Sequence, residues 1–143
     1  MTTGGLTEEK KIKGRKRHVC TDTQGNLLFV KVHAANIHDS IGGCDVAYQS
    51  FRRYSSLQSF CADLAYRGST TDFVENGLKL KMDIAQKSDT KGFKVIAKRW
   101  VVERFFSWIG NFRRFSKDYE ILACTSEEMI MIAAIILLLN KLF

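Results

Sequence analysis

The sequence predicts a single α/β domain that mixes strands and helices. Three observations support this class: two neighbouring segments rich in β-branched residues at 16–23 and 26–35, an alternation of helix-like and strand-like segments after them, and an apolar fraction of 45%. With 143 residues, the chain is long enough to bury its own core. Because no internal repeat divides it, we expect one domain at 18–143, preceded by a basic N-terminal arm at 1–17.

The first elements are a predicted β-hairpin and a helix. Turn-forming residues at 23–26 separate the two strand-like segments. Asp39 and Ser40 are candidate caps for the helix that follows. We expect this helix to run to about Tyr54 after an interruption at the glycines of 42–43.

The middle of the chain is predicted to hold two strands and a short helix. Residues 57–62 form a short apolar strand, and 69–76 form a short helix that Gly77 ends. Residues 78–85 alternate apolar and polar side chains, which predicts a half-buried strand. A polar loop at 86–92 follows.

Two helices are predicted to close the chain. The first is basic and aromatic-rich, and its apolar stripe recurs every three or four residues at Val101, Phe105, Trp108, Phe112 and Phe115. The second begins near Ser126, and its continuous apolar run covers 129–139. Since a bilayer span needs about 20 apolar residues, we interpret this run as a buried closing helix.

The net charge favours an anionic partner. Lysine and arginine outnumber aspartate and glutamate by 22 to 15, giving +7, and the excess lies at 10–17 and 91–117. Two basic blocks of this kind are typical of nucleic-acid binding. The candidate DNA contacts are Lys13, Arg15, Lys16, Arg17, Lys98, Arg99, Arg104, Arg113, Arg114 and Lys117.

The cysteines and the first residues favour a cytoplasmic protein. Cys20, Cys44, Cys61 and Cys124 are widely spaced and lack zinc-site spacing, so we expect buried thiols in a reducing cytosol. Residues 1–17 lack the apolar core of a signal peptide. We therefore expect no membrane partner.

Two carboxylates are the candidates for chemistry. Asp63 follows an apolar strand and should lie at the C-terminal edge of the sheet, although it could instead cap a helix or turn. Glu103 lies off the apolar stripe of its helix and could instead pair with Arg99 or Arg104. Together, two carboxylates can bind hard divalent cations, and two Mg²⁺ ions about 3.5–4 Å apart would support phosphodiester chemistry. Such a site normally needs a third carboxylate, but Asp22 better fits a turn cap.

The histidines and Ser107 are weaker candidates for catalytic or metal-binding residues. His18, His33 and His38 lack the spacing of a metal pair or a nucleophile dyad, so we assign them to packing and loop hydrogen bonds. Ser107 lacks the context of a nucleophile, and the sequence contains no glycine-rich phosphate loop.

Four segments together resemble a known family. They are KKIKGRKRHVCTDT at 10–23, GNLLFVKVHAANIHDS at 25–40, ADLAYRG at 62–68 and GFKVIAKRWVVERFFSWIGNFRRFSKDYE at 92–120. Followed by the closing apolar helix, they resemble the C-terminal catalytic part of bacterial insertion-sequence transposases of the DDE type.

The resemblance implies an RNase H-like fold, with a mixed sheet flanked by helices. It also implies DNA transposition by cleavage and strand transfer at a two-metal Mg²⁺ (or Mn²⁺) site. Asp63 matches the second aspartate of the family's triad, Glu103 the glutamate, and Arg99 the arginine of the glutamate-centred signature. The tyrosine and lysine of that signature are replaced by Ile96 and Gly110.

The first aspartate of the triad has no match in this chain. In the family it lies upstream of the GRKRH segment, and residues 1–12 contain no aspartate. We therefore expect an incomplete RNase H-like fold that lacks its first strand, with little or no catalysis by this chain alone.

Three interpretations follow from the resemblance. The leading one is a transposase portion, either from a decayed element or from an element split between two reading frames. Its partners would be double-stranded DNA of element ends and target, together with a second copy, a full-length transposase or an upstream-frame product. The alternative is a non-catalytic DNA-binding or regulatory remnant that interferes with full-length transposase. A third interpretation is a product without function.

Overall fold

The computed structural model describes residues 2–10, 15–84, 99–113 and 122–143, with the backbone alone described at 2–10, 99 and 100. Within these residues, five strands form one sheet in the order β3-β2-β1-β4-β5. The strands are β1 (Thr2–Lys10), β2 (Arg15–Thr21), β3 (Leu27–Ala34), β4 (Leu57–Ala62) and β5 (Lys81–Ile84). β1 pairs antiparallel with β2 and parallel with β4, so the sheet is mixed.

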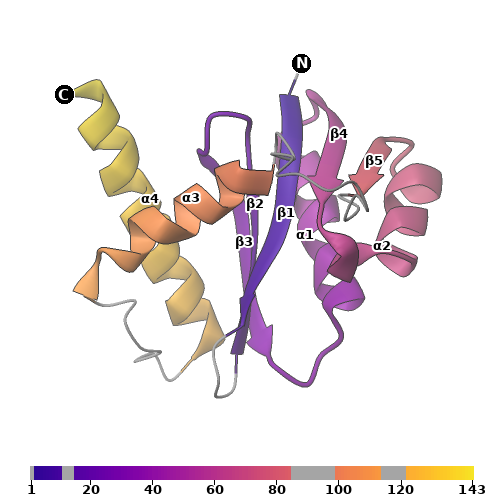
Figure 1. Ribbon diagram of the computed structural model, residues 1–143, viewed down its shortest axis with the longest axis horizontal. Helices are drawn as coiled ribbons and strands as arrows, with labels where there is room; N and C mark the ends of the chain where they lie inside the picture. The colour runs from indigo at the N-terminus through magenta and orange to yellow at the C-terminus, as the bar shows by residue number, and fades with distance from the viewer. Residues whose placement is uncertain (1, 11–14, 85–98, 114–121) are drawn as a thin grey trace, which may run out of the picture.

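Helices cover both faces of this sheet. They are α1 (Asp39–Arg53), α2 (Ser69–Asp72), α3 (Arg99–Gly110) and α4 (Ala123–Leu142), with short helical turns η1 (Leu64–Tyr66) and η2 (Phe73–Gly77). Figure 1 shows α3 and α4 on one side of the sheet and α1 on the other. Cys20 of β2 packs in the core below α1, while its neighbour Val19 packs with Val102 and Phe105 of α3. Because successive side chains of a strand point to opposite faces, β2 contributes to the hydrophobic cores on both faces of the sheet.

The N-terminal segment differs from our expectation. The α/β class is confirmed, but the prediction that the first strand is missing is wrong, because β1 occupies the central position of the sheet. Residues 2–10 and 15–17, expected to form an arm, are strand residues. The composition of 2–10 concealed this strand, since it includes two glycines and three charged residues.

The predicted hairpin is confirmed, and Asp22 organises its turn. The carboxylate of Asp22 accepts hydrogen bonds from the backbone N–H groups of Gln24 and Asn26, each at 2.9 Å. Gly25 adopts a positive φ of 86°, which a side chain would oppose. The turn-capping role that we preferred for Asp22 is therefore its observed role.

Helix α1 is continuous through its two glycines. It begins after His38, whose Nδ1 accepts a hydrogen bond from the Ser40 N–H at 3.3 Å. A Cβ atom at Gly42 would lie 2.5 Å from Nε2 of His33, and one at Gly43 would lie 2.5 Å from the Tyr66 ring. The glycines therefore allow α1 to approach the sheet and η1 closely, and the predicted interruption is wrong.

Helix α4 is buried on one face only. Ser126, Ile130, Ala133 and Ala134 are its buried residues, and it packs against β3 and α3. The outer face exposes large apolar side chains. The expectation of a buried closing helix is thus confirmed for the inner face and wrong for the outer one.

The cysteines are all free, as the sequence predicts, but they differ in burial. Cys20 is fully buried, Cys44 and Cys61 are half-buried, and Cys124 is exposed. The expectation of four buried thiols is therefore confirmed for Cys20, met in part by Cys44 and Cys61, and wrong for Cys124.

Candidate functional site

Asp63 lies where strand β4 ends, as the sequence predicts. Its backbone is still extended, with φ −82° and ψ 177°, and it caps the helical turn η1. One carboxylate oxygen accepts a hydrogen bond from the Ala65 N–H at 3.1 Å. Asp63 therefore combines the two positions that the sequence left open: the C-terminal edge of the sheet and the cap of a turn.

Strand β1 runs past Asp63 on one side. Leu6 pairs with Ala62, the residue before Asp63, and β1 continues beyond Leu6 through Glu8 and Glu9. This part of β1 contains no aspartate. The strand that passes Asp63 therefore carries glutamates at this end.

Strand β5 borders Asp63 on the other side. Cys61 pairs with Asp83, so Asp83 also lies near this end of the sheet. Its carboxylate forms an ion pair with Lys81 at 3.5 Å, and both side chains are well exposed.

The turn that follows Asp63 is anchored by buried hydrogen bonds. The Tyr66 hydroxyl lies 2.5 Å from Nδ1 of His18 on β2, and both side chains are fully buried. The Thr70 hydroxyl donates to the Ser40 carbonyl at 2.9 Å, which ties the next turn to α1. These contacts fix the backbone that positions Asp63. The sequence did not predict them, because they join segments that lie far apart along the chain.

His18 also packs against a second histidine. The ring centroids of His18 and His33 lie 4.5 Å apart, and the Nε2 atoms of both are buried without a hydrogen-bond partner. Burial, and secondarily the charge of His33, lowers the pKa of His18 from 6.5 to about 4. His18 is therefore uncharged at neutral pH, and the prediction that the histidines serve packing and loop hydrogen bonds is confirmed.

Glu103 is exposed on helix α3. The sheet-facing side of this helix is formed by Val101, Val102, Phe105 and Ile109, all buried. Glu103 lies away from these residues, as the sequence predicts from its place off the apolar stripe. Val102 and Ile109 were absent from the predicted stripe, because the helix buries a wider face than one residue per turn.

The described side chains do not complete a metal site. Among the side chains that the structure describes, no group of three His, Cys, Asp or Glu residues could hold a metal ion. Asp63 already accepts a backbone hydrogen bond, and Glu103 is turned toward solvent. Asp63 and Glu103 are thus the two predicted metal ligands among the described side chains, and a two-metal site takes several oxygen ligands for each ion.

Several of the predicted DNA contacts make internal interactions. Lys16 pairs with Asp39 and donates to the carbonyl of Ile37 at 3.1 Å. Arg17 is only 4% exposed. The Arg104 guanidinium lies 4.7 Å from the Trp108 ring centroid and donates to a turn carbonyl at 3.3 Å. These side chains therefore take part in contacts within the fold.

The remaining predicted contacts fall into three groups. Arg113 is exposed, three residues beyond the end of α3, and Arg15 is half-buried on β2. Arg99 belongs to the first turn of α3, where only the backbone is described. Outside the described residues lie Lys13, Lys98, Arg114 and Lys117.

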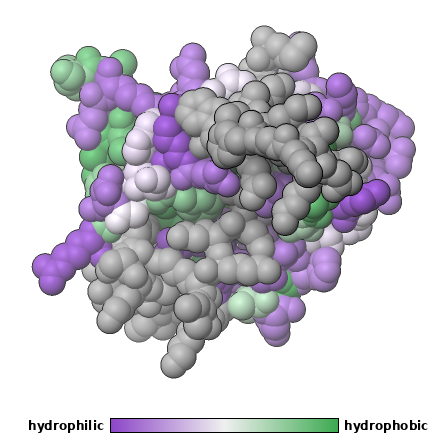
Figure 2. Space-filling model, viewed as in Figure 1, coloured by the Kyte–Doolittle hydropathy of each residue, from purple (hydrophilic) through white to green (hydrophobic). Residues whose placement is uncertain are grey.

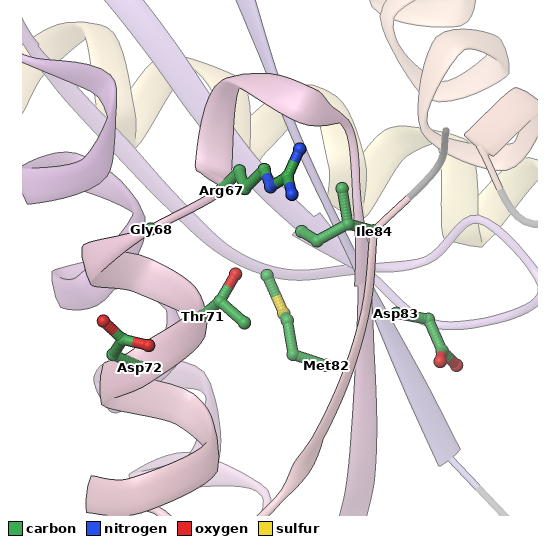
Figure 3. Close-up of a pocket in the computed structure, with 7 residues that line it drawn as sticks. All are labelled: Arg67, Gly68, Thr71, Asp72, Met82, Asp83 and Ile84. Atoms are coloured by element: carbon green, nitrogen blue, oxygen red, sulfur yellow. The ribbon is translucent and has the colours of Figure 1, made fainter. Parts of the chain in front are cut away.

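A pocket opens beside the Asp63 turn. Its volume is about 450 Å³, and it lies between the start of α2 and strand β5 (Figure 3). Arg67 extends over it, Thr71 and Met82 face each other across it, and Ile84 closes one side. Asp72 and Asp83 also line it. The pocket thus brings Arg67 and Asp72 near the side chains of Met82 and Ile84, whereas the carboxylate of Asp83 points away from them (Figure 3).

The fold is similar to that of retroviral integrase catalytic cores. The catalytic core of the BIV integrase superposes with a TM-score of 0.64 at 12% identity, covering 93% of this chain and 80% of that one. The HTLV-2 integrase catalytic core in complex with magnesium, in its dimeric form, gives a TM-score of 0.56 at 18% identity, covering 93% and 81%. The simian T-cell lymphotropic virus intasome gives 0.59 at 14%, covering 93% and 46%. At these identities the likeness establishes an RNase H-like fold.

Sequence comparison identifies the family. Comparison with curated proteins found no match. The family model for the transposase DDE domain, in contrast, matches residues 2–139, which is nearly the whole chain. The match includes β1, both candidate carboxylates and most of α4. This chain therefore belongs to the family of transposase DDE domains.

Proposed function

We propose that this domain binds double-stranded DNA at the ends of a mobile element and that Asp63 and Glu103 are acidic residues of its Mg²⁺-dependent site for cleavage and strand transfer. We further propose that the chain alone retains DNA without cutting it. The observation that carries this proposal is the family match over 2–139, combined with Asp63 at the edge of the central sheet.

The composition of β1 supports the second half of the proposal. Thr2–Lys10 contains no aspartate, the residue type that the family's triad has in its first position. Two-metal sites bind both the attacking and the leaving oxygen, so an incomplete ligand set disturbs metal occupancy and geometry together. DNA binding, in contrast, needs only exposed cations.

The DNA-binding half is tested by filter binding on duplex DNA from the chromosomal sequence that flanks this coding region. We expect retention that falls steeply with salt, because cations on the protein release counterions from phosphates. Arg113→Ala should reduce the salt slope by about one for each phosphate that the arginine neutralises. The matched control is Arg52→Ala, which removes the same charge from an exposed position on α1. Salt-independent retention, or none, would contradict the proposal.

The catalytic half is tested by a nicking assay on a supercoiled plasmid that carries the same flanking DNA. We expect no nicking by this chain in Mg²⁺ or Mn²⁺. Nicking that Glu103→Gln abolishes without loss of DNA retention would support the site and overturn the proposed inactivity. In that case Glu8→Gln and Glu9→Gln would be the next variants, because these residues lie in the strand that passes Asp63. Nicking that survives Glu103→Gln would overturn the site.

A second candidate function is interference with a full-length transposase of this family. The absence of an aspartate from β1 favours it, since a domain that binds ends without cutting them would occupy the substrate. The test is an excision assay with a full-length transposase active on those ends. Added chain should lower excision, and Arg113→Ala should weaken that effect. Excision unchanged at saturating chain would exclude this function.

A further inference from the structure

We propose that the pocket between α2 and β5 binds one unpaired nucleotide of DNA, with its phosphate on Arg67 and its base between Thr71 and Met82. This inference rests on the proposed function and deepens it, because it names the form of DNA that the domain receives beside Asp63. Arg67 is not among the DNA contacts that the sequence predicts.

Arg67 offers a cation that the fold does not use. Its side chain is exposed and extends over the pocket (Figure 3). Among the residues that the structure describes, its guanidinium has no hydrogen-bond or ion-pair partner. Arg17 and Arg104 differ, since the first is buried and the second donates to the carbonyl of Gln24. A free guanidinium can form two parallel hydrogen bonds to a phosphate, so Arg67 is available for DNA.

The backbone fixes Arg67 beside Asp63. Both residues belong to one turn, in which Asp63 caps the start of η1 and Arg67 caps its end. The Arg67 N–H donates to the carbonyl of Leu64 at 3.1 Å. Gly68 follows with φ 96° and ψ −117°, and no atom lies within 4 Å of the position of a Cβ there. Gly68 therefore serves the backbone conformation that leads into α2, and not packing. A phosphate on Arg67 would thus belong to a strand that passes the Asp63 turn.

The interior of the pocket suits a base better than a phosphate. Its volume of about 450 Å³ lies within the range of small-ligand pockets. Met82 is 6% exposed and Ile84 is half-buried, so two apolar side chains line it. The Thr71 hydroxyl donates to the carbonyl of Tyr66 at 3.3 Å, which leaves its oxygen as an acceptor. Pockets for extruded bases combine apolar contacts to the faces of the base with hydrogen bonds to its edge.

The carboxylates near the pocket limit it to one phosphate. Asp72 lines the pocket from α2. The carboxylate of Asp83 points away from the pocket interior and pairs with Lys81 at 3.5 Å (Figure 3). Asp72 would repel a second phosphate, whereas the exocyclic amino group of a base can donate a hydrogen bond to a carboxylate. The charges therefore favour a phosphate at Arg67 and a base inside the pocket.

A base can enter this pocket only when it is unpaired. In a duplex the bases are stacked and paired, and a protein binds one in a pocket after it has left the stack. The surface around α2, at the right-hand edge of Figure 2, is mainly hydrophilic. The apolar interior is thus local, which suits one planar base rather than a broad protein interface. The ligand is therefore an unpaired nucleotide at an open end of duplex DNA.

Filter binding of the full chain to two DNAs is the first test. One is the flanking duplex used above, and the other is the same duplex with a mismatched, forked end. We expect the forked duplex to be retained about tenfold more tightly, because only an unpaired nucleotide reaches both Arg67 and the pocket. Arg67→Ala should abolish this preference. The matched control is Arg52→Ala, which should keep it, since Arg52 lies at an exposed position on α1.

Photocross-linking tests the position of the base. 5-Iodouracil is placed in the forked arm, and the cross-linked peptide is identified by mass spectrometry. We expect a cross-link to Met82. Met82→Leu should remove the cross-link and keep the preference for forked DNA, because leucine conserves the volume. 5-Iodouracil at the same position of the paired duplex should not cross-link to Met82.

Three results would overturn the nucleotide pocket. They are equal retention of forked and paired DNA, a preference that survives Arg67→Ala, and cross-links that lie only outside the pocket. Each of these leaves the DNA-binding proposal standing as long as the paired duplex is retained. Loss of all retention, in contrast, would overturn both proposals.

Discussion

His18 is a buried imidazole between the Tyr66 hydroxyl and the ring of His33. Its pKa is lowered from 6.5 to about 4, chiefly by burial. At pH values between about 4 and 6.5, His18 is protonated in the unfolded chain but not in the folded chain. His18 therefore contributes its full stability above pH 6.5, and that contribution is lost as the pH falls toward 4. We expect urea unfolding to lose about 3 kcal/mol over this range on account of His18.

His18→Gln separates this effect from general acid unfolding. Glutamine cannot take up the proton, so the drop in unfolding free energy between pH 6.5 and 4 should shrink by a similar amount. His38→Gln removes a histidine from the exposed start of α1 and is the control. An unchanged pH profile in His18→Gln would contradict the assignment of a neutral, buried His18.

The thiols differ in reactivity because their burial differs. Burial raises the pKa of the Cys20 thiol to about 12, whereas Cys124 is exposed. Since the thiolate is the reacting form, we expect Cys124 to be modified first by a maleimide and Cys20 last. Mass spectrometry of briefly labelled, folded protein would show the order. Modification of Cys20 before unfolding would mean that β2 is open to solvent.

Single residues were predictable where their role is local. Asp22 in its turn and Asp63 at a strand end follow from neighbours within a few residues. Arg17 and Arg104 were predicted to contact DNA; Arg17 is buried in the sheet, and Arg104 donates to the carbonyl of Gln24, which is distant along the chain. Those environments depend on distant segments, which a charge count along the chain does not include.

At the scale of elements, the contact of α1 with the sheet depends on its two glycines. By helix propensity alone, Gly→Ala inside a helix should stabilise by about 1 kcal/mol. Here a Cβ at Gly42 would meet His33 and His18 at 2.5 and 2.6 Å, and one at Gly43 would meet the Tyr66 ring at 2.5 Å. We therefore expect each alanine variant to lose about 1–3 kcal/mol in urea unfolding. In α3, Gly110→Ala has no neighbour within 4 Å and is the control, which should not destabilise.

The elements were also predictable from the sequence where local signals define them, and not where contacts with distant segments do. The hairpin, α3 and the strand before Asp63 were predictable from periodicity and turn residues. The continuity of α1 was not, because glycine breaks an isolated helix and only the packing against His33 and Tyr66 explains it. The outer face of α4 was also missed, since an apolar run does not show how much of it another element covers.

At the scale of the whole molecule, strand β1 joins the two halves of the sheet. The β2–β3 hairpin lies on one side of it and the β4–β5 pair on the other. Leu6 pairs with Cys20 of β2 and with Ala62 of β4, so both halves depend on the same backbone. The two cores rest on opposite faces of this one sheet. Loss of β1 should therefore unfold the domain as a unit.

Leu6→Pro tests this central position. Proline removes a backbone donor and disrupts the ladder, which should lower the unfolding free energy by about 3 kcal/mol or more. Lys81→Pro is the control, because Lys81 is the first residue of edge strand β5, where proline is tolerated. If 1–17 were a detached arm, Leu6→Pro would leave the urea midpoint unchanged. A larger loss of unfolding free energy in Leu6→Pro than in Lys81→Pro would instead establish that the segment before the GRKRH motif completes the sheet. It would also establish that this segment forms the strand beside Asp63.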